Sequence, residues 1–121
     1  MPHRTWRTKF SDAFRGFRHG VRGQSSFFVH FFFAAAVVGA GLALRVTLVE
    51  WCLLALCIAG VLTAEMFNTA LEKLVKATVK QHNPEVGAAL DISSAAVLLA
   101  SIGAVVVGAI IFTPKLWAIF A

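Results

Sequence analysis

Apolar residues are grouped in three long blocks and do not alternate with polar ones. The blocks cover residues 27–44, 46–71 and 92–113, and the first is interrupted only by His30. A helix needs about 20 mostly apolar residues to cross a bilayer, and the period-2 alternation of a transmembrane strand is absent. The pattern predicts three transmembrane helices, the second and third with cytoplasmic extensions, at residues 27–44, 49–78 and 84–112.

The N-terminal segment has a different pattern. Trp6, Phe10, Phe14, Phe17 and Val21 recur every three or four residues, with charged residues between them. This periodicity is typical of an amphipathic helix that lies in the membrane interface. We expect such a surface helix over residues 5–22.

Two prolines mark the expected ends of the third span. Asn83 before Pro84 is a helix-start signal, because Asn caps well and Pro is tolerated at the first helical position. Thr113 and Pro114 are expected to stop the same helix. Spans two and three are joined by about five residues, so they should be antiparallel neighbours.

Composition and charge agree with a membrane protein. The chain of 121 residues is 59% hydrophobic and 14% charged, against ~45–50% and ~25% in soluble domains. It forms one domain, residues 1–121. Nine of its eleven lysines and arginines precede span one or follow span two, while Arg45 and Lys115 lie at the opposite ends. The positive-inside rule places the N-terminus in the cytoplasm and the C-terminus outside. Nothing indicates a nucleic-acid-binding module.

A polar cluster interrupts the second block at its inner end. Glu65, Asn68 and Glu72 follow one face of a helix, expected to look toward span three. Asp91 should lie at a similar depth on span three, so four oxygen-bearing side chains are expected to converge. Three uses are compatible with such a cluster: interhelical hydrogen bonding, binding of Mg²⁺ with phosphates, or a proton pathway.

Two motifs, "EMFNTALE" at 65–72 and "ALDISSAAVLLA" at 89–100, resemble those of the small prokaryotic diacylglycerol kinase and undecaprenol kinase family. The resemblance extends over nearly the whole chain and includes Gly16, His30 and the Glu50–Trp51 pair. It implies an all-α homotrimeric enzyme of the bacterial inner membrane. Such an enzyme transfers the γ-phosphoryl group of Mg-ATP to a membrane lipid alcohol, diacylglycerol or undecaprenol, at the cytoplasmic interface.

The resemblance also implies roles for single residues. Glu65 matches the general base, and Asn68 the residue that orients phosphate or metal. Glu72 matches a metal-binding carboxylate and Ser94 a lipid contact. The implied ATP-binding residues are Asp91, Leu90, Gly87, Arg15 and Arg18.

Four positions depart from the family pattern. Gln24 replaces a second metal-binding Glu, Phe28 an Arg, Lys76 an Asp and Leu90 a Lys. We expect Lys76 to restore the cation lost at Leu90, and Gln24 to bind metal through its carbonyl. A lipid-binding scaffold of the same fold with altered or lost catalysis, or a small proton-coupled transporter, are the alternatives. His30 is interpreted as a hydrogen-bonded packing or interface residue, and Glu50 as solvated or paired with Arg45.

Overall fold

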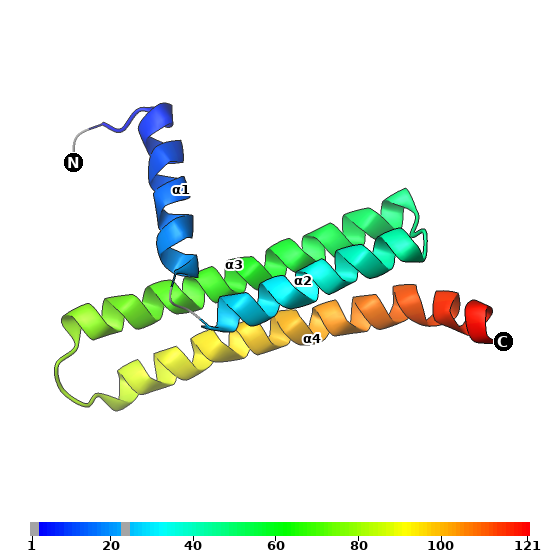
Figure 1. The fold of residues 1–121 in the computed structure, drawn as a ribbon. Coiled ribbons are helices and arrows are strands. Elements are labelled where there is room, and N and C mark those ends of the chain that lie inside the picture. The colour runs from blue at the N-terminus through cyan, green and yellow to red at the C-terminus, as the bar shows by residue number, and fades with distance from the viewer. Residues whose placement is uncertain (1–2, 23–24) are drawn as a thin grey trace.

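The computed structural model describes residues 3–22 and 25–121, and these form four helices and no strand (Figure 1). They are listed here in chain order: α1 (Trp6–Val21), α2 (Ser25–Ala43), α3 (Leu48–Thr78) and α4 (Pro84–Phe120). The last three are long and apolar enough to cross a membrane. The chain is therefore an all-helical membrane protein, as its hydrophobic pattern predicts.

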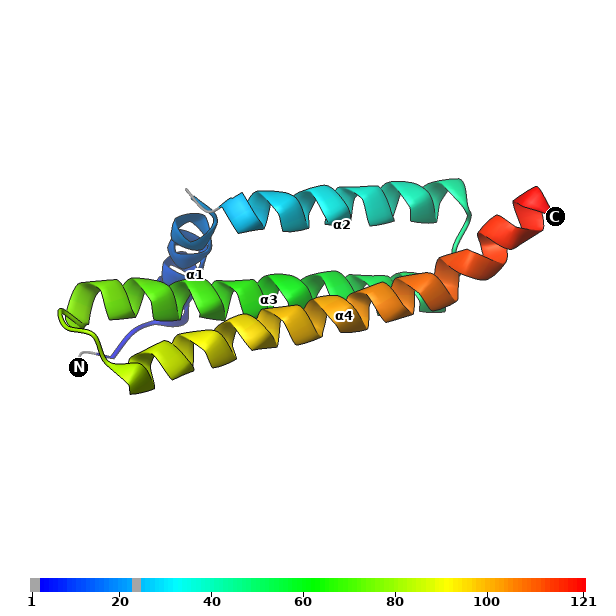
Figure 2. The ribbon, with the colours of Figure 1, turned by 90° about the horizontal axis from the view of Figure 1, so that it is seen from below.

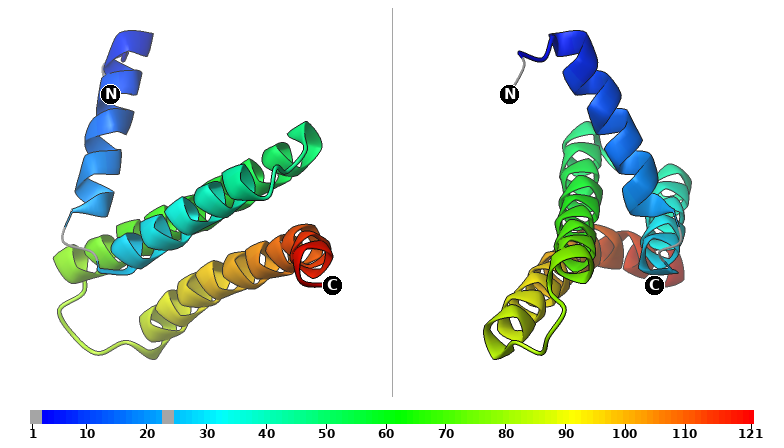
Figure 3. Two further views of the ribbon diagram at one scale, coloured as in Figure 1. Left: turned by 45° about the vertical axis from the view of Figure 1, so that its right-hand side comes forward. Right: turned by 90° about the vertical axis from the view of Figure 1, so that its left-hand side faces the viewer.

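Helix α1 lies across the direction of the other helices, near the start of α2 (Figures 1 and 3). It begins where the Thr5 hydroxyl accepts a hydrogen bond from the backbone N–H of Thr8. The C-terminal end of α1 contacts α3, where Gly20 is buried against Met66. A Cβ atom on Gly20 would lie 2.7 Å from the Met66 sulfur, so this contact depends on the absence of a side chain.

Helices α2 and α3 form an antiparallel hairpin joined by residues 44–47. Arg45 adopts a left-handed backbone conformation with φ of 54°. Thr47 and Glu50 then form a reciprocal capping box at the start of α3. Gly41 lets α2 approach the ring of Trp51, because a Cβ atom there would lie 2.6 Å from the ring.

Helices α3 and α4 form the tightest pair and run antiparallel along most of their length (Figure 2). The Asn83 side chain caps α4 by accepting hydrogen bonds from the N–H groups of Glu85 and Val86, as expected for Asn before Pro. Eight of the buried and half-buried residues of α4 recur every three or four positions and so form its face toward α3: Val86, Leu90, Ser93, Val97, Ala100, Ala104, Val107 and Ile111.

The predicted end of the third span is wrong. Helix α4 continues through Thr113 and Pro114 to Phe120, and Figure 2 shows it bending toward its C-terminal end. A proline inside a helix removes one hydrogen bond and crowds the carbonyl four residues earlier, which bends a helix without always ending it.

The continued helix changes the partner of Glu50. Lys115 Nζ lies 3.0 Å from Glu50 Oε1, so this carboxylate pairs across to α4. The expected pairing with Arg45 is therefore wrong. The ion pair depends on the helical turn that follows Pro114, and the sequence prediction ended the helix before that turn.

The protein has a small core. Val46, Leu54 and Ile111 form its buried centre, near the turn between α2 and α3. An apolar cavity of about 330 Å³ lies between α2, α3 and α4, with Val37, Leu54 and Phe112 at one end and His30 at the other. Most other large apolar side chains face outward, as expected of helices whose solvent is lipid.

Candidate active site

The polar residues of α3 lie on one face, as their spacing predicts. Glu65 and Asn68 are buried, with 4% and 8% of their surface exposed, and Glu72 is half-buried. They belong to the stripe of α3 that packs against the neighbouring helices, together with Leu54 and Val61. A carboxylate in this position needs partners, because an unpaired charge is costly to bury.

Glu65 finds its partners on α2. Ser26 Oγ donates a hydrogen bond of 2.7 Å to Glu65 Oε1, and His30 Nε2 lies 3.3 Å from Glu65 Oε2. We call these three residues the Glu65 cluster. The expectation that Glu65 faces span three is therefore wrong, because its carboxylate is directed to the first turns of span one.

Asn68 finds its partner on α4 and in turn holds Glu72. Ser93 Oγ donates a 2.8 Å hydrogen bond to Asn68 Oδ1, and Asn68 Nδ2 donates a 3.1 Å bond to Glu72 Oε1. We call these three residues the Glu72 cluster. The side-chain amide of Asn68 thus connects the half-buried carboxylate to the facing helix, and it fixes one carboxylate oxygen of Glu72.

The structure does not bring Asp91 into this cluster. Ser93 faces α3, and Asp91 lies two residues earlier, about 200° away around the helix axis. Asp91 is exposed, and it makes no hydrogen bond or ion pair with the residues that the structure describes. Asp91 lies near the level of Asn68 along the helices, as predicted, because Ser93 contacts Asn68. Its side chain, however, leaves α4 on the side away from α3.

The other predicted residues occupy varied positions. Gly87 is exposed on the first turns of α4, with open space where a side chain would be. Leu90 is half-buried on the face toward α3, and Lys76 and Ser94 are exposed. Gln24, the expected second metal ligand, lies outside the described residues.

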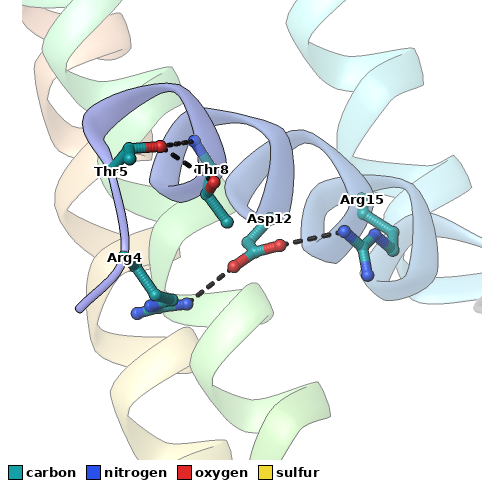
Figure 4. A network of polar contacts seen from close by, with 5 residues as sticks. All are labelled: Arg4, Thr5, Thr8, Asp12 and Arg15. Atoms are coloured by element: carbon teal, nitrogen blue, oxygen red, sulfur yellow. Dashed lines mark hydrogen bonds and ion pairs between the residues drawn. The ribbon is translucent and has the colours of Figure 1, made fainter. Parts of the chain in front are cut away.

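The two predicted arginines are on α1. Arg15 and Arg4 both pair with Asp12, at 2.9 and 2.7 Å, and the cap residue Thr5 and Thr8 lie close by at the start of the helix (Figure 4). Arg18 is exposed one turn later. The Arg15 guanidinium is therefore engaged within α1, and binding a phosphate there would require it to share or leave Asp12.

The donor set for a metal ion is sparse. Within residues 3–22 and 25–121, no three His, Cys, Asp or Glu side chains gather closely enough to hold one. Glu72 is the best-placed ligand, since Asn68 holds one of its oxygens and the side chain is half-buried. One carboxylate fits Mg²⁺, which is usually held by one or two carboxylates together with substrate phosphates and water.

Sequence reasoning missed Ser26 and Ser93, and it named His30 without its contact to Glu65. Ser26 and His30 are four residues apart, so their side chains share a helix face, and this spacing was a usable signal. Ser93 continues the three-and-four spacing of Val86 and Leu90. That periodicity distinguishes it from its exposed neighbour Ser94.

The fold and the site together define a class of protein. Three apolar helices cross the membrane, and two carboxylate clusters gather at the end of the bundle where α1 lies, as in an enzyme that acts on a membrane lipid. Residues 11–112 match the family described as prokaryotic diacylglycerol kinase. The chain belongs to this family, and it is therefore a lipid kinase, an ATP-dependent phosphotransferase.

Two characterised relatives are similar to the chain. An undecaprenol kinase of Bacillus subtilis is 30% identical over 123 residues, covering 96% of this chain and all of the relative. A diacylglycerol kinase of Synechocystis sp. is 37% identical over 108 residues, covering 88% of this chain and 62% of the relative. No solved structure is significantly similar to the chain.

Proposed function

We propose that the protein transfers the γ-phosphoryl group of Mg-ATP to the hydroxyl of diacylglycerol or undecaprenol, at the cytoplasmic face of a bacterial inner membrane. The observation that carries this proposal is the arrangement of the two carboxylates. Glu65 is buried and Glu72 half-buried, about 10 Å apart along α3, with Glu72 nearer the inner end. In the proposed reaction the lipid hydroxyl meets Glu65 from within the membrane, and the nucleotide phosphate meets Glu72 from the aqueous side.

Glu65 is the general base of the proposed reaction. It accepts the proton of the lipid hydroxyl as the lipid oxygen bonds to the γ-phosphorus of ATP. The bond from that phosphorus to the bridging oxygen breaks, and ADP leaves with its electrons. Phosphoryl transfer requires mainly positioning and neutralisation of charge, so one base beside a bound nucleotide is sufficient.

Glu72 and Asn68 form the proposed phosphate end of the site. Glu72 would hold Mg²⁺, which neutralises phosphate charge when it is bound. Asn68 keeps the Glu72 carboxylate in place through a hydrogen bond of 3.1 Å. Gln24 is proposed as a further ligand. Around them we propose ATP contacts from Gly87, Leu90, Lys76, Arg15 and Arg18.

We further propose that the active unit is a homotrimer. Asp91 and Ser94 are exposed on the side of α4 away from α3. A site that includes them therefore lies between this chain and a neighbouring copy, which would supply the other ATP and lipid contacts. The large apolar side chains exposed on α2 and α4, among them Phe32 and Val105, leave surface for helix contacts between protomers. Mass measurement of the protein in lipid nanodiscs should give three copies per particle.

The test of the function is an ATP-dependent phosphorylation assay on both alcohols, with purified protein in lipid nanodiscs. Glu65→Gln should lower kcat by roughly 10²- to 10⁴-fold, the usual contribution of a general base. Glu72→Gln should lower the rate and raise the Mg²⁺ concentration needed for half-maximal turnover. Glu50→Gln is the matched control, since Glu50 lies on the same helix at its other end and should keep its activity.

The assay also separates the two substrates. A rate on undecaprenol well above that on diacylglycerol, or the reverse, assigns the lipid alcohol. Folded protein that phosphorylates neither alcohol would refute the proposed function.

A further inference from the structure

The first two turns of α2 hold the carboxylate of Glu65 from one side. Ser26 and His30 are one helical turn apart, so both side chains leave the helix in the same direction. Ser26 Oγ reaches Oε1 at 2.7 Å, and His30 Nε2 reaches Oε2 at 3.3 Å. Each carboxylate oxygen therefore has its own partner on α2.

These partners are the ones that a buried carboxylate needs. The Glu65 side chain is 5% exposed and the His30 side chain 19%, so neither group is well solvated. Among the residues that the structure describes, Ser26 and His30 make the side-chain polar contacts to this carboxylate. A carboxylate oxygen has two lone pairs, so each oxygen still has one available for an incoming proton.

The position of α2 relative to α3 fixes this arrangement. Phe27, between the two polar residues, is fully buried and anchors the start of α2. His30 also lines the apolar cavity between α2, α3 and α4. Its ring therefore contacts Glu65 and the cavity together, at the level where a lipid alcohol would meet the carboxylate.

We infer that Ser26 and His30 are positioning residues for Glu65, which hold both oxygens of the proposed base in the orientation for proton abstraction. The inference rests on the proposed function of Glu65. Neither residue is assigned a contact with the lipid or the nucleotide, and both act through the Glu65 carboxylate. This role goes beyond the interpretation of His30 as a hydrogen-bonded packing or interface residue.

Three substitutions at position 30 separate positioning from packing. His30→Ala removes both the ring and the N–H donor, His30→Phe keeps an aromatic ring without a donor, and His30→Gln keeps a side-chain N–H. We expect kcat to fall roughly 10- to 100-fold in the Ala and Phe variants, because small misplacements of a reacting group have effects of this size. The KM for ATP should change less than about twofold.

The Gln variant is the decisive one. It should recover most of the lost kcat, since its amide can place an N–H beside Oε2, where His30 Nε2 lies at 3.3 Å. Ser26→Ala should behave like His30→Ala, and Ser26→Thr should keep most of the activity. His82→Ala is the matched control, because this exposed histidine lies in the loop before α4 and should have the parent kcat.

Equal kcat values in the parent and in His30→Phe would overturn the inference, and so would a Gln variant as slow as the Phe variant. A parent protein without kinase activity would refute the proposed function but would leave the contact of Glu65 with α2 to be tested separately. The contact is then tested by thermal unfolding of His30→Ala, Glu65→Leu and the double variant. Non-additive shifts in Tm support the pairing, and additive shifts overturn it.

Discussion

Ser93 is the member of the Glu72 cluster that comes from α4, and its hydroxyl donates to Asn68. Its contact with Asn68 is an interhelical hydrogen bond of 2.8 Å between buried groups. Removing the donor leaves Asn68 Oδ1 without its partner, and measured interhelical bonds of this kind contribute about 0.6–2 kcal/mol in membranes. Ser93→Ala should therefore lower the free energy of unfolding by about 1 kcal/mol.

Thermal or SDS-induced unfolding of the purified protein measures this change. Ser94→Ala is the matched control for stability, since the neighbouring hydroxyl is exposed, and we expect it to unfold at the parent temperature. If the two variants unfold alike, the Asn68–Ser93 bond contributes nothing to the packing of α3 on α4.

At this scale the sequence predicts faces better than partners. The i, i+3, i+7 spacing of Glu65, Asn68 and Glu72 placed them correctly on one face of α3, because helical geometry is local. It could not predict that Glu65 turns to α2 while Asn68 turns to α4. A single helix face is wide enough to touch two neighbours, and the choice depends on how those neighbours pack.

At the scale of elements, Gly41 and Gly39 of α2 form a matched pair. A Cβ atom at Gly41 would lie 2.6 Å from the ring of Trp51, whereas nothing lies within 4 Å of one at Gly39. The large ring has little room to move, so Gly41→Ala should destabilise the hairpin by about 1–3 kcal/mol, the usual effect of overpacking. Gly39→Ala should be neutral or stabilising by up to about 1 kcal/mol, because alanine favours helix.

The measurement is the unfolding free energy of both variants in the same detergent, with Trp51 fluorescence as a probe of the contact. A Gly41→Ala protein as stable as the parent would show that α2 is not held closely against α3 at this point.

Sequence signals predicted one end of α4 correctly and the other end wrongly. Asn83 and Pro84 start α4 as expected, since capping is a local interaction between neighbouring residues. Thr113 and Pro114 do not end it, because the following turn gains a contact that compensates for the proline. That contact is the Lys115–Glu50 pair, which joins residues distant in sequence and is invisible to a local rule.

At the scale of the whole molecule, the polar contacts between α3 and α4 bracket the apolar part of the bundle. Glu50 pairs with Lys115 at one end, and Asn68 with Ser93 at the other. At about 1.5 Å per residue, these contacts are about 27 Å apart along α3 and about 33 Å apart along α4. Both lengths match a hydrocarbon core of about 30 Å.

This bracket gives depths to the two clusters. Asn68 and Ser93 lie near one hydrocarbon boundary, Glu65 about 5 Å inside it and Glu72 about 6 Å outside it. These depths agree with the proposed division of the site into a lipid end at Glu65 and a nucleotide end at Glu72.

The distribution of basic residues predicts which loop faces the cytoplasm. Basic residues crowd the end that carries α1 and residues 79–83, so that end should be inside. In a Cys52→Ala, Cys57→Ala background, single cysteines at Arg45 and Gln81 report the two sides. In intact bacterial cells, a membrane-impermeant maleimide should label Arg45→Cys directly and Gln81→Cys only after permeabilisation. The reverse pattern would invert the topology and place the Glu72 cluster away from cytoplasmic ATP, which the proposed reaction does not permit.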